Sequence, residues 1–289
     1  MNNLERDLVM HVINGNMPRA KDTAKMILQQ STTKKDKEFC ETMLQKLEKK
    51  QLAFSIPSNI QGCLEVEDVS SSFREDRYYL KDRELFEKIE KMCRSAEKLE
   101  EMGISFTNSC LLYGESGTGK TTFGKYVAYK LGLPFAYLNF SYVLDSYMGN
   151  TGKNLSRCFD FVKQHRCVFM LDELDAIGQS RGSKTDVGEM NRILINLIQC
   201  IDNLPNNVLL LGATNRSDIL DPALSRRFFH KQEMRRLDRE ERVELCRSYF
   251  RSIHFPISEE DVIALAEAEQ TQADLIKKIV FFLAEHFSE

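Results

Sequence analysis

In the segment Leu111-Leu112-Tyr113-Gly114-Glu115-Ser116-Gly117-Thr118-Gly119-Lys120-Thr121-Thr122, an apolar run is followed by a glycine-rich turn and by the start of a helix. The spacing G-x-x-x-x-G-K-T is that of the phosphate-binding P-loop. Glycines let the backbone approach a phosphate closely, so that bare N–H groups can donate to its oxygens. The positive end of the following helix dipole would face the same oxygens. The segment therefore predicts a site for a nucleotide's phosphates.

Each polar residue of this motif has an expected role. Lys120 would reach the β- and γ-phosphates with its charge, and the Thr121 hydroxyl would bind Mg²⁺. An ordinary glycine turn before a helix is the alternative, and it is disfavoured because strand, turn and helix all occur where the motif requires them. The residues expected to bind the nucleotide here are Gly114, Glu115, Ser116, Gly117, Thr118, Gly119, Lys120, Thr121 and Thr122.

The composition indicates a globular protein with a packed core. Of the 289 residues, 42% are hydrophobic and 29% charged, and the net charge is −3, which argues against nucleic acid as a partner. The eight cysteines form no C-x-x-C pair, so the sequence predicts neither a zinc site nor a redox motif. The N-terminus lacks the features of a signal peptide, and no apolar stretch approaches the roughly 20 residues of a membrane span. A cytoplasmic location is expected.

The chain divides by pattern into four parts. Residues 1–50 contain three short helical segments and predict a small N-terminal helical domain, which is either a solvated prefix or a partner-docking module. Residues 51–75 lose periodicity and contain proline, glycine and a run of serines, so they are expected to be a linker. Strands and helices alternate over 76–236, which indicates a parallel α/β sheet. Residues 237–289 are again helical.

Within the last two parts, we expect individual elements from the apolar periodicity. A loop is expected at 178–188. The expected strands lie at 111–113, 134–140, 167–171 and 208–213, and the expected helices at 82–99, 155–164, 189–201, 238–252, 258–268 and 272–287.

Polar side chains follow two of the expected strands. The apolar run 167–171 ends in Asp172 and Glu173, about fifty residues after the P-loop. Asp172 would hold Mg²⁺ beside Thr121, and Glu173 would polarise a water for attack on the γ-phosphate. Asn215 ends the next strand, where an amide can orient that water; the alternative is an ordinary turn asparagine.

Three motifs together resemble the AAA family of ATPases. They are Gly114 to Thr121, Leu171-Asp172-Glu173-Leu174-Asp175-Ala176-Ile177, and Ala213-Thr214-Asn215-Arg216 with Leu220-Asp221-Pro222-Ala223-Leu224. The resemblance covers about residues 75–289. It implies a P-loop NTPase αβα sandwich with a parallel sheet and a C-terminal helical lid. It also implies a homo-oligomeric ring, usually a hexamer, with ATP and Mg²⁺ between neighbouring subunits.

The resemblance assigns roles to further residues. Arg226 and Arg227 would be arginine fingers that reach a neighbour's nucleotide, although a solvated basic turn is the alternative; two abutting arginines are similar to the microtubule-severing and membrane-remodelling branch. Tyr147-Met148-Gly149 resembles a first pore loop, with ordinary loop packing as the alternative, and Arg181 to Val187 would be a second. In Thr271-Gln272-Ala273-Asp274, Ala273 would contact the nucleotide from the lid, with Gln272 replacing the usual glycine.

The function that follows is ATP hydrolysis by a ring that remodels or unfolds a protein substrate or partner. One alternative is a nucleotide-gated regulator of a partner enzyme, because the chain also resembles, more loosely, bacterial ATPases paired with a subtilisin-like protease in phage-defence or plasmid-incompatibility modules. Another alternative is a nucleic-acid motor or loader, which the acidic balance disfavours.

Overall fold

The computed structural model describes residues 3–13, 23–24, 26–27, 56–104, 106–140, 143, 151–179 and 184–288. The chain divides into two compact units, Met1–Phe54 and Ser55–Glu289. In the first unit, α1 (Asn3–Ile13) confirms the first expected helix. Helical residues at 23–24 and 26–27 fall within the second expected helix, about residues 18–30, whereas the third, expected after residue 33, lies outside the described residues.

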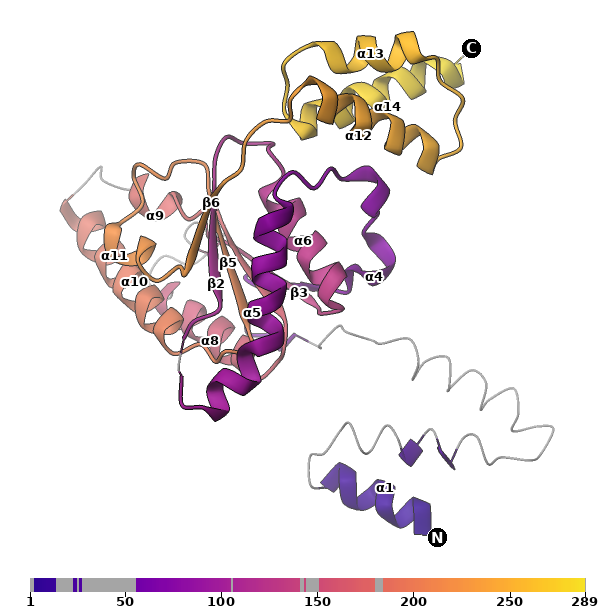
Figure 1. Cartoon of the computed structure of the whole chain (residues 1–289). Helices are drawn as coiled ribbons and strands as arrows, with labels where there is room; N and C mark the ends of the chain where they lie inside the picture. The colour runs from indigo at the N-terminus through magenta and orange to yellow at the C-terminus, as the bar shows by residue number, and fades with distance from the viewer. Residues whose placement is uncertain are drawn as a thin grey trace. The chain divides into compact units, whose positions relative to one another are not determined.

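The second unit is built on a six-stranded sheet (Figure 1). The strand order is β1-β3-β4-β5-β2-β6; β1 is antiparallel to β3 and every other pair is parallel. This confirms the expected α/β fold. The strands are β1 (Glu65–Glu67), β2 (Ser109–Tyr113), β3 (Phe135–Asn139), β4 (Val168–Asp172), β5 (Leu209–Thr214) and β6 (His230–Glu233).

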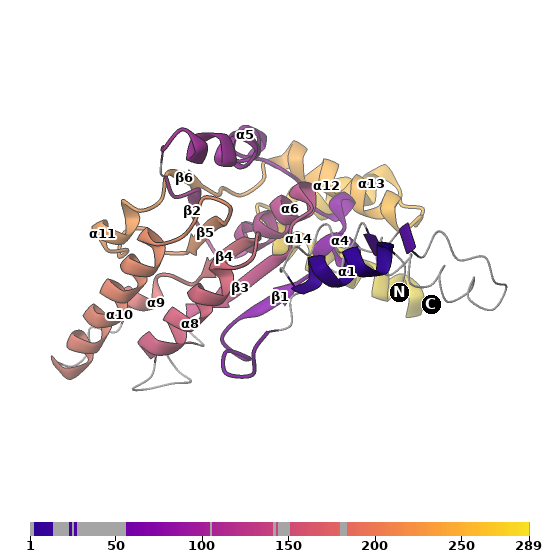
Figure 2. The same ribbon diagram turned by 90° about the horizontal axis from the view of Figure 1, so that it is seen from below.

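Helices cover both faces of this sheet, as Figures 1 and 2 show. On one face, α5 (Arg83–Glu101) and α6 (Lys120–Leu131) pack on the strands through Ile89 and Phe123, both fully buried. The opposite face carries α8 (Thr151–Lys163) and α10 (Lys184–Asp202). The shorter helical elements are α4 (Val69–Ser72), η1 (Glu75–Arg77), α9 (Ala176–Gln179) and α11 (Pro222–Ser225).

Three helices form a C-terminal lid with its own apolar cluster. They are α12 (Arg239–Ser252), α13 (Glu259–Glu267) and α14 (Gln272–Ser288), and they confirm the three expected segments. Asp238 and Glu241 form a capping box in which each side chain accepts the other residue's backbone N–H, so α12 begins where the sequence predicts. Leu245, Phe250 and Ile279 are buried between the helices.

The expected linker at 51–75 is a wrong prediction over its described part, 56–75. These residues form β1 and α4, and they bury Ile60, Leu64 and Val69 in the second unit. Elements of three or four residues are too short to show a period, which explains why the pattern looked irregular. The expected loop at 178–188 is shorter than predicted as well, because α9 extends to Gln179 and α10 begins at Lys184.

Gly212, in the middle of β5, provides a test of the packing. A Cβ atom there would lie 2.5 Å from the ring of Phe228, a buried residue that directly follows Arg227. We expect Gly212→Ala to lower the free energy of unfolding by about 1–3 kcal/mol, because the sheet and the ring cannot both keep their places. Urea unfolding of the purified protein measures this change.

The matched control is Gly188, in α10. A Cβ atom at Gly188 would meet nothing within 4 Å. Gly188→Ala should therefore be neutral or stabilise the protein by up to about 1 kcal/mol through helix propensity. Equal unfolding curves for Gly212→Ala and the wild type would contradict the packing argument.

Candidate active site

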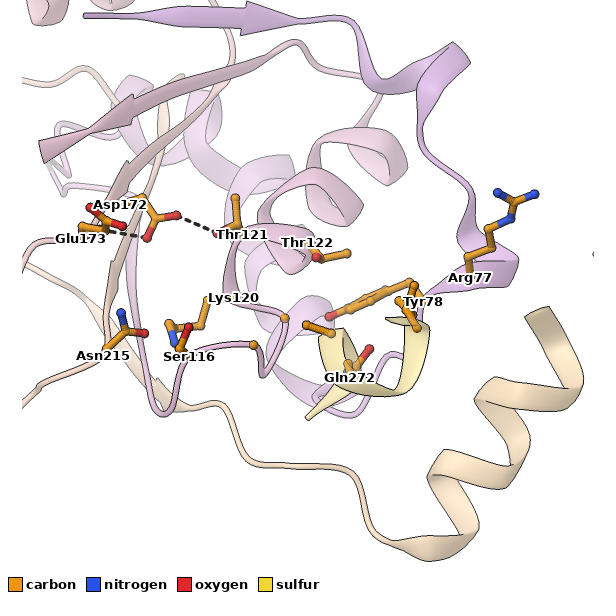
Figure 3. Close-up of a pocket in the computed structure, with 14 residues that line it drawn as sticks. Arg77, Tyr78, Ser116, Lys120, Thr121, Thr122, Asp172, Glu173, Asn215 and Gln272 are labelled. Carbon is orange, nitrogen blue, oxygen red and sulfur yellow. Dashed lines mark hydrogen bonds between the residues drawn. The ribbon is translucent and has the colours of Figure 1, made fainter. Parts of the chain in front are cut away.

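A cavity of about 500 Å³ lies between the P-loop, the ends of β4 and β5, and the lid (Figure 3). It brings together ten of the residues predicted from the sequence. These are Ser116, Gly117, Gly119, Lys120, Thr121, Thr122, Asp172, Glu173, Asn215 and Ala273.

The P-loop backbone has the shape that its glycines permit. Gly117 and Gly119 have φ values of +81° and +95°, a left-handed conformation that favours glycine. Gly114 is needed for a different reason, since a Cβ atom there would lie 2.4 Å from the carbonyl oxygen of Met234. Lys120 donates to the carbonyl oxygens of Gly114 and Glu115, at 2.7 Å each, so its ammonium group lies over the loop. Burial lowers the pKa of Lys120, and nearby carboxylates oppose that change.

Two oxygen ligands suited to magnesium meet at this edge of the sheet. The Thr121 hydroxyl donates to Asp172 Oδ2 at 2.7 Å, and the Tyr137 hydroxyl donates to the same oxygen at 3.3 Å. Burial raises the pKa of Tyr137 to about 12, so its hydroxyl keeps the proton that it donates. A hydroxyl and a carboxylate fit Mg²⁺, which takes few protein oxygens and keeps several waters. Among the described residues, no group of three or more His, Cys, Asp or Glu side chains could hold a metal.

Glu173 has an unusual backbone. Its φ is +58°, which is costly for a residue with a side chain. The conformation is held from both sides, because the Glu173 N–H donates to Asp172 Oδ1 at 2.9 Å and the Leu174 N–H donates to the Ala213 carbonyl at 3.0 Å. The chain thus turns sharply after β4, and Glu173 lines the cavity beside Asp172 (Figure 3).

Asp175 organises the end of β5, a role that the sequence did not suggest. This buried carboxylate accepts the Thr214 hydroxyl at 3.0 Å and the Asn215 N–H at 3.1 Å through Oδ1. It therefore fixes the backbone from which Asn215 extends into the cavity. The one feature of the sequence that could have indicated this role is the position of Asp175, three residues after Asp172 on the same chain turn.

The lid side of the cavity contains three residues that were not predicted, Arg77, Tyr78 and Ile276. Two hydrogen bonds fix the lid here: Gln272 Nε2 donates to the Tyr79 carbonyl at 3.3 Å, and the Ala273 N–H donates to the Gly117 carbonyl at 3.2 Å. An aromatic ring and an apolar side chain beside backbone polar groups suit a flat heterocyclic base. In the sequence, the adjacent Tyr78 and Tyr79 before α5 were the one local feature that could have indicated a contact with the base.

Three predicted P-loop residues support the loop without lining the cavity. Gly114 is constrained as described above, and the buried Thr118 hydroxyl donates to the Glu115 carbonyl at 2.9 Å. The Glu115 carboxylate forms an ion pair with Arg236 at 2.7 Å, and Arg236 also lies 3.5 Å from Glu269. Glu115 therefore connects the P-loop with the segment that enters the lid.

The two adjacent arginines have different surroundings. Arg227 pairs with Asp202 through two nitrogens, at 3.1 and 3.2 Å, and donates to the Ala223 carbonyl. Arg226 is exposed and forms no ion pair with the part of the chain that the structure describes. Neither lines the cavity. Tyr147, Met148 and Gly149 lie outside the described residues, as do the side chains of 181–187.

Comparison with known proteins agrees with this geometry. Residues 110–236 match the model of the "ATPase family associated with various cellular activities (AAA)". The chain carries an AAA-family ATPase domain. This domain contains the P-loop, Asp172, Glu173, Asn215 and both arginines. No helix in the described residues is long and apolar enough to cross a membrane.

Several known proteins are similar to part of this chain. The 26S proteasome regulatory subunit 10B homolog A of Arabidopsis thaliana is 33% identical over 64% of this chain and 49% of its own length. The proteasome-activating nucleotidase of Pyrococcus abyssi is 34% identical over 67% of this chain and 50% of its own. An AAA family ATPase of Sinorhizobium fredii is 33% identical over 47% of this chain and 41% of its own length. The chain thus spans about half the length of these relatives, or less.

The contact between Thr121 and Asp172 predicts a magnesium-dependent effect on nucleotide affinity. Thr121→Ala should weaken ATP binding about tenfold in the presence of Mg²⁺, because one oxygen ligand is lost. Thr121→Ser, which keeps the hydroxyl, should bind almost normally. Titration with a fluorescent ATP analogue, with Mg²⁺ and with EDTA, measures both. An equal loss of affinity in EDTA would show that the hydroxyl supports the loop and not the metal.

Proposed function

We propose that this protein hydrolyses ATP and uses the energy to remodel or unfold a protein. The observation that carries the proposal is the contact of Thr121 with Asp172 beside Glu173, in one cavity with the P-loop lysine and within an AAA domain. The relatives named as an ATPase and as a nucleotidase support the hydrolysis, and the proteasome-related names of two relatives support a protein as the substrate.

In the proposed reaction, the chain's own groups position the nucleotide and a water. The P-loop N–H groups and Lys120 hold the phosphates. Thr121 and Asp172 would hold Mg²⁺, which when bound would supply positive charge beside the phosphates. Glu173 accepts a proton from the water that attacks the γ-phosphate. Asn215, fixed by Asp175, orients that water. Tyr78, Ala273 and Ile276 contact the base.

We further propose that the protein acts as a ring of identical subunits, with six as the expected number. Arg226 is the arginine that reaches the neighbouring subunit's γ-phosphate, because it is exposed and not engaged by another described side chain. Arg227 holds this segment against α10 through Asp202. The sequence suggested that both arginines act as fingers. Because Arg227 is paired with the Asp202 carboxylate, we favour Arg226 for this role.

Glu173→Gln tests the hydrolysis. Turnover of ATP should fall by about 10²-fold or more while ATP affinity stays within a few-fold of the wild type, because an amide cannot accept the proton. Phosphate release and equilibrium binding measure the two quantities. Glu97→Gln is the matched control, since its carboxylate pairs with Arg166 outside the cavity. Near-normal turnover in Glu173→Gln would remove Glu173 from the reaction.

Tyr147 tests what the ATP is used for. If this tyrosine grips a threaded chain, Tyr147→Ala should keep ATP binding and basal turnover but lose unfolding of a tagged model substrate, whereas Tyr147→Phe should be mild because the ring remains. The unfolding rate, measured beside the ATPase rate, separates these outcomes. Full unfolding activity in Tyr147→Ala would exclude threading by this residue. A substrate-independent effect on a partner enzyme would then favour the nucleotide-gated regulator.

A further inference from the structure

We infer that the side chain of Gln272 selects the base of the nucleotide, and that it selects adenine through the 6-amino group. The inference rests on the proposed function and deepens it, because ATP hydrolysis alone does not explain how the protein distinguishes ATP from GTP. The glycine that usually occupies this position of the motif has no side chain to read a base, so the role is particular to this chain.

The Gln272 side chain is buried at the lid end of the cavity. Only 6% of the residue is exposed, and it lines the cavity as the first residue of α14. It lies beside Tyr78, since a Cβ atom on Gly119 would be 3.5 Å from the Tyr78 ring and 3.6 Å from Gln272 Nε2. Asp172 and Glu173 lie at the other end, past the P-loop (Figure 3). Gln272 therefore faces the part of a bound nucleotide that is remote from the γ-phosphate.

One hydrogen bond fixes the direction of the Gln272 amide. Nε2 donates to the Tyr79 carbonyl at 3.3 Å, and because a carbonyl can only accept, the nitrogen must be the end that faces it. The amide oxygen, Oε1, is then directed away from Tyr79, and none of the described residues donates to it. A buried acceptor without a donor is unfavourable. Since the cavity is the open side of this side chain, a bound ligand is expected to supply the donor.

The neighbours of Gln272 suit a base. Ile276 is one turn further along α14, on the same face of the helix as Gln272, and it also lines the cavity. The Tyr78 ring is held by the rings of Phe73 and Tyr126, whose centroids lie 6.2 and 5.6 Å from its own. A fixed aromatic ring and an apolar side chain offer surfaces for a heterocycle, and an amide oxygen beside them can read its edge.

The two purines differ at the position that such an oxygen would read. Adenine carries an amino group at position 6, which donates, whereas guanine carries a carbonyl oxygen there, which accepts. Oε1 only accepts, so it would pair with the adenine amino group and would meet the guanine oxygen acceptor to acceptor. A site built to hydrogen-bond one group strongly rejects an analogue that leaves its polar atom unpaired. Gln272 would thus favour ATP over GTP.

Changing the residue and the base together tests this contact. The two nucleotides are ATP and purine riboside triphosphate, which has hydrogen in place of the 6-amino group; displacement of a fluorescent ATP analogue gives their affinities. In the wild type, loss of the amino group should weaken binding about three- to tenfold, the usual effect of one hydrogen bond. In Gln272→Leu, which keeps the size and removes the acceptor, the two nucleotides should bind equally well.

The ratio of the two affinities separates a direct contact from structural support. Gln272→Leu also removes the hydrogen bond to Tyr79, which weakens the hold of the lid on every nucleotide. A purely structural role would lower both affinities by the same factor and keep the wild-type ratio, whereas a direct contact makes the ratio disappear. Ile276→Val is the matched control, because it trims the apolar surface and leaves Oε1 in place, so the wild-type ratio should remain.

Hydrolysis of GTP measures the resulting specificity. The wild type should show a kcat/KM for ATP roughly tenfold or more above that for GTP, and Gln272→Leu should reduce this preference several-fold. If circular dichroism shows that Gln272→Leu is unfolded, Gln272→Gly takes its place with the same expected ratios.

The outcomes distinguish a failed inference from a failed function. Equal binding of ATP and purine riboside triphosphate by the wild type, or a difference that survives in Gln272→Leu, would overturn the role of Gln272 while ATP hydrolysis stands. A wild-type preference for GTP would do the same. If the effect of Gln272→Leu is coupled to 2′-deoxy-ATP and not to the purine analogue, Oε1 binds the ribose and the assignment to the base is wrong. A wild type that hydrolyses no nucleotide would overturn the proposed function itself.

Discussion

The parallel pairing of β2 with β5, and of β5 with β4, is the constraint on which the site depends. The register places Tyr113 opposite Thr214 and Leu171 opposite Gly212, so the three chain turns that follow these strands emerge at one edge of the sheet. Nearly all the side chains that hold this register are buried and apolar. A slip of one residue would move every side chain of a strand to the opposite face of the sheet and would shift the strand's end, so the core and the cavity are specified together.

The cavity's central residues could be predicted because their roles depend on local chain order. A glycine-rich turn that follows a strand can be recognised from a few residues, and this turn places Lys120. An acid or amide at the end of a buried strand can be recognised in the same way, as for Asp172 and Asn215. Tyr78 and Asp175 could not be predicted in this way. Their importance comes from what the folded chain places beside them, the lid for Tyr78 and the end of β5 for Asp175. β6 was missed because His230-Lys231-Gln232-Glu233 carries no apolar run.

The sequence alone also could not predict which side chains are engaged by distant partners. Arg226 and Arg227 are chemically identical, yet the carboxylate of Asp202, 25 positions away from Arg227, engages one of them. Glu115 was expected to bind the nucleotide with the rest of the P-loop, whereas in the structure it does not line the cavity and its carboxylate pairs with Arg236. In both cases, an ion pair with a residue far away in the sequence gives a side chain a role that no local sequence pattern indicates.

The hydrogen bond from the Ala273 N–H to the Gly117 carbonyl links the lid to the phosphate loop through a single peptide plane. That plane is rigid, and its other polar group is the N–H of Thr118, on the side opposite the carbonyl. A movement of the lid that kept this bond would therefore turn the plane, and with it the Thr118 N–H. The angle of the lid would then be coupled to the direction of a P-loop donor without any side chain between them.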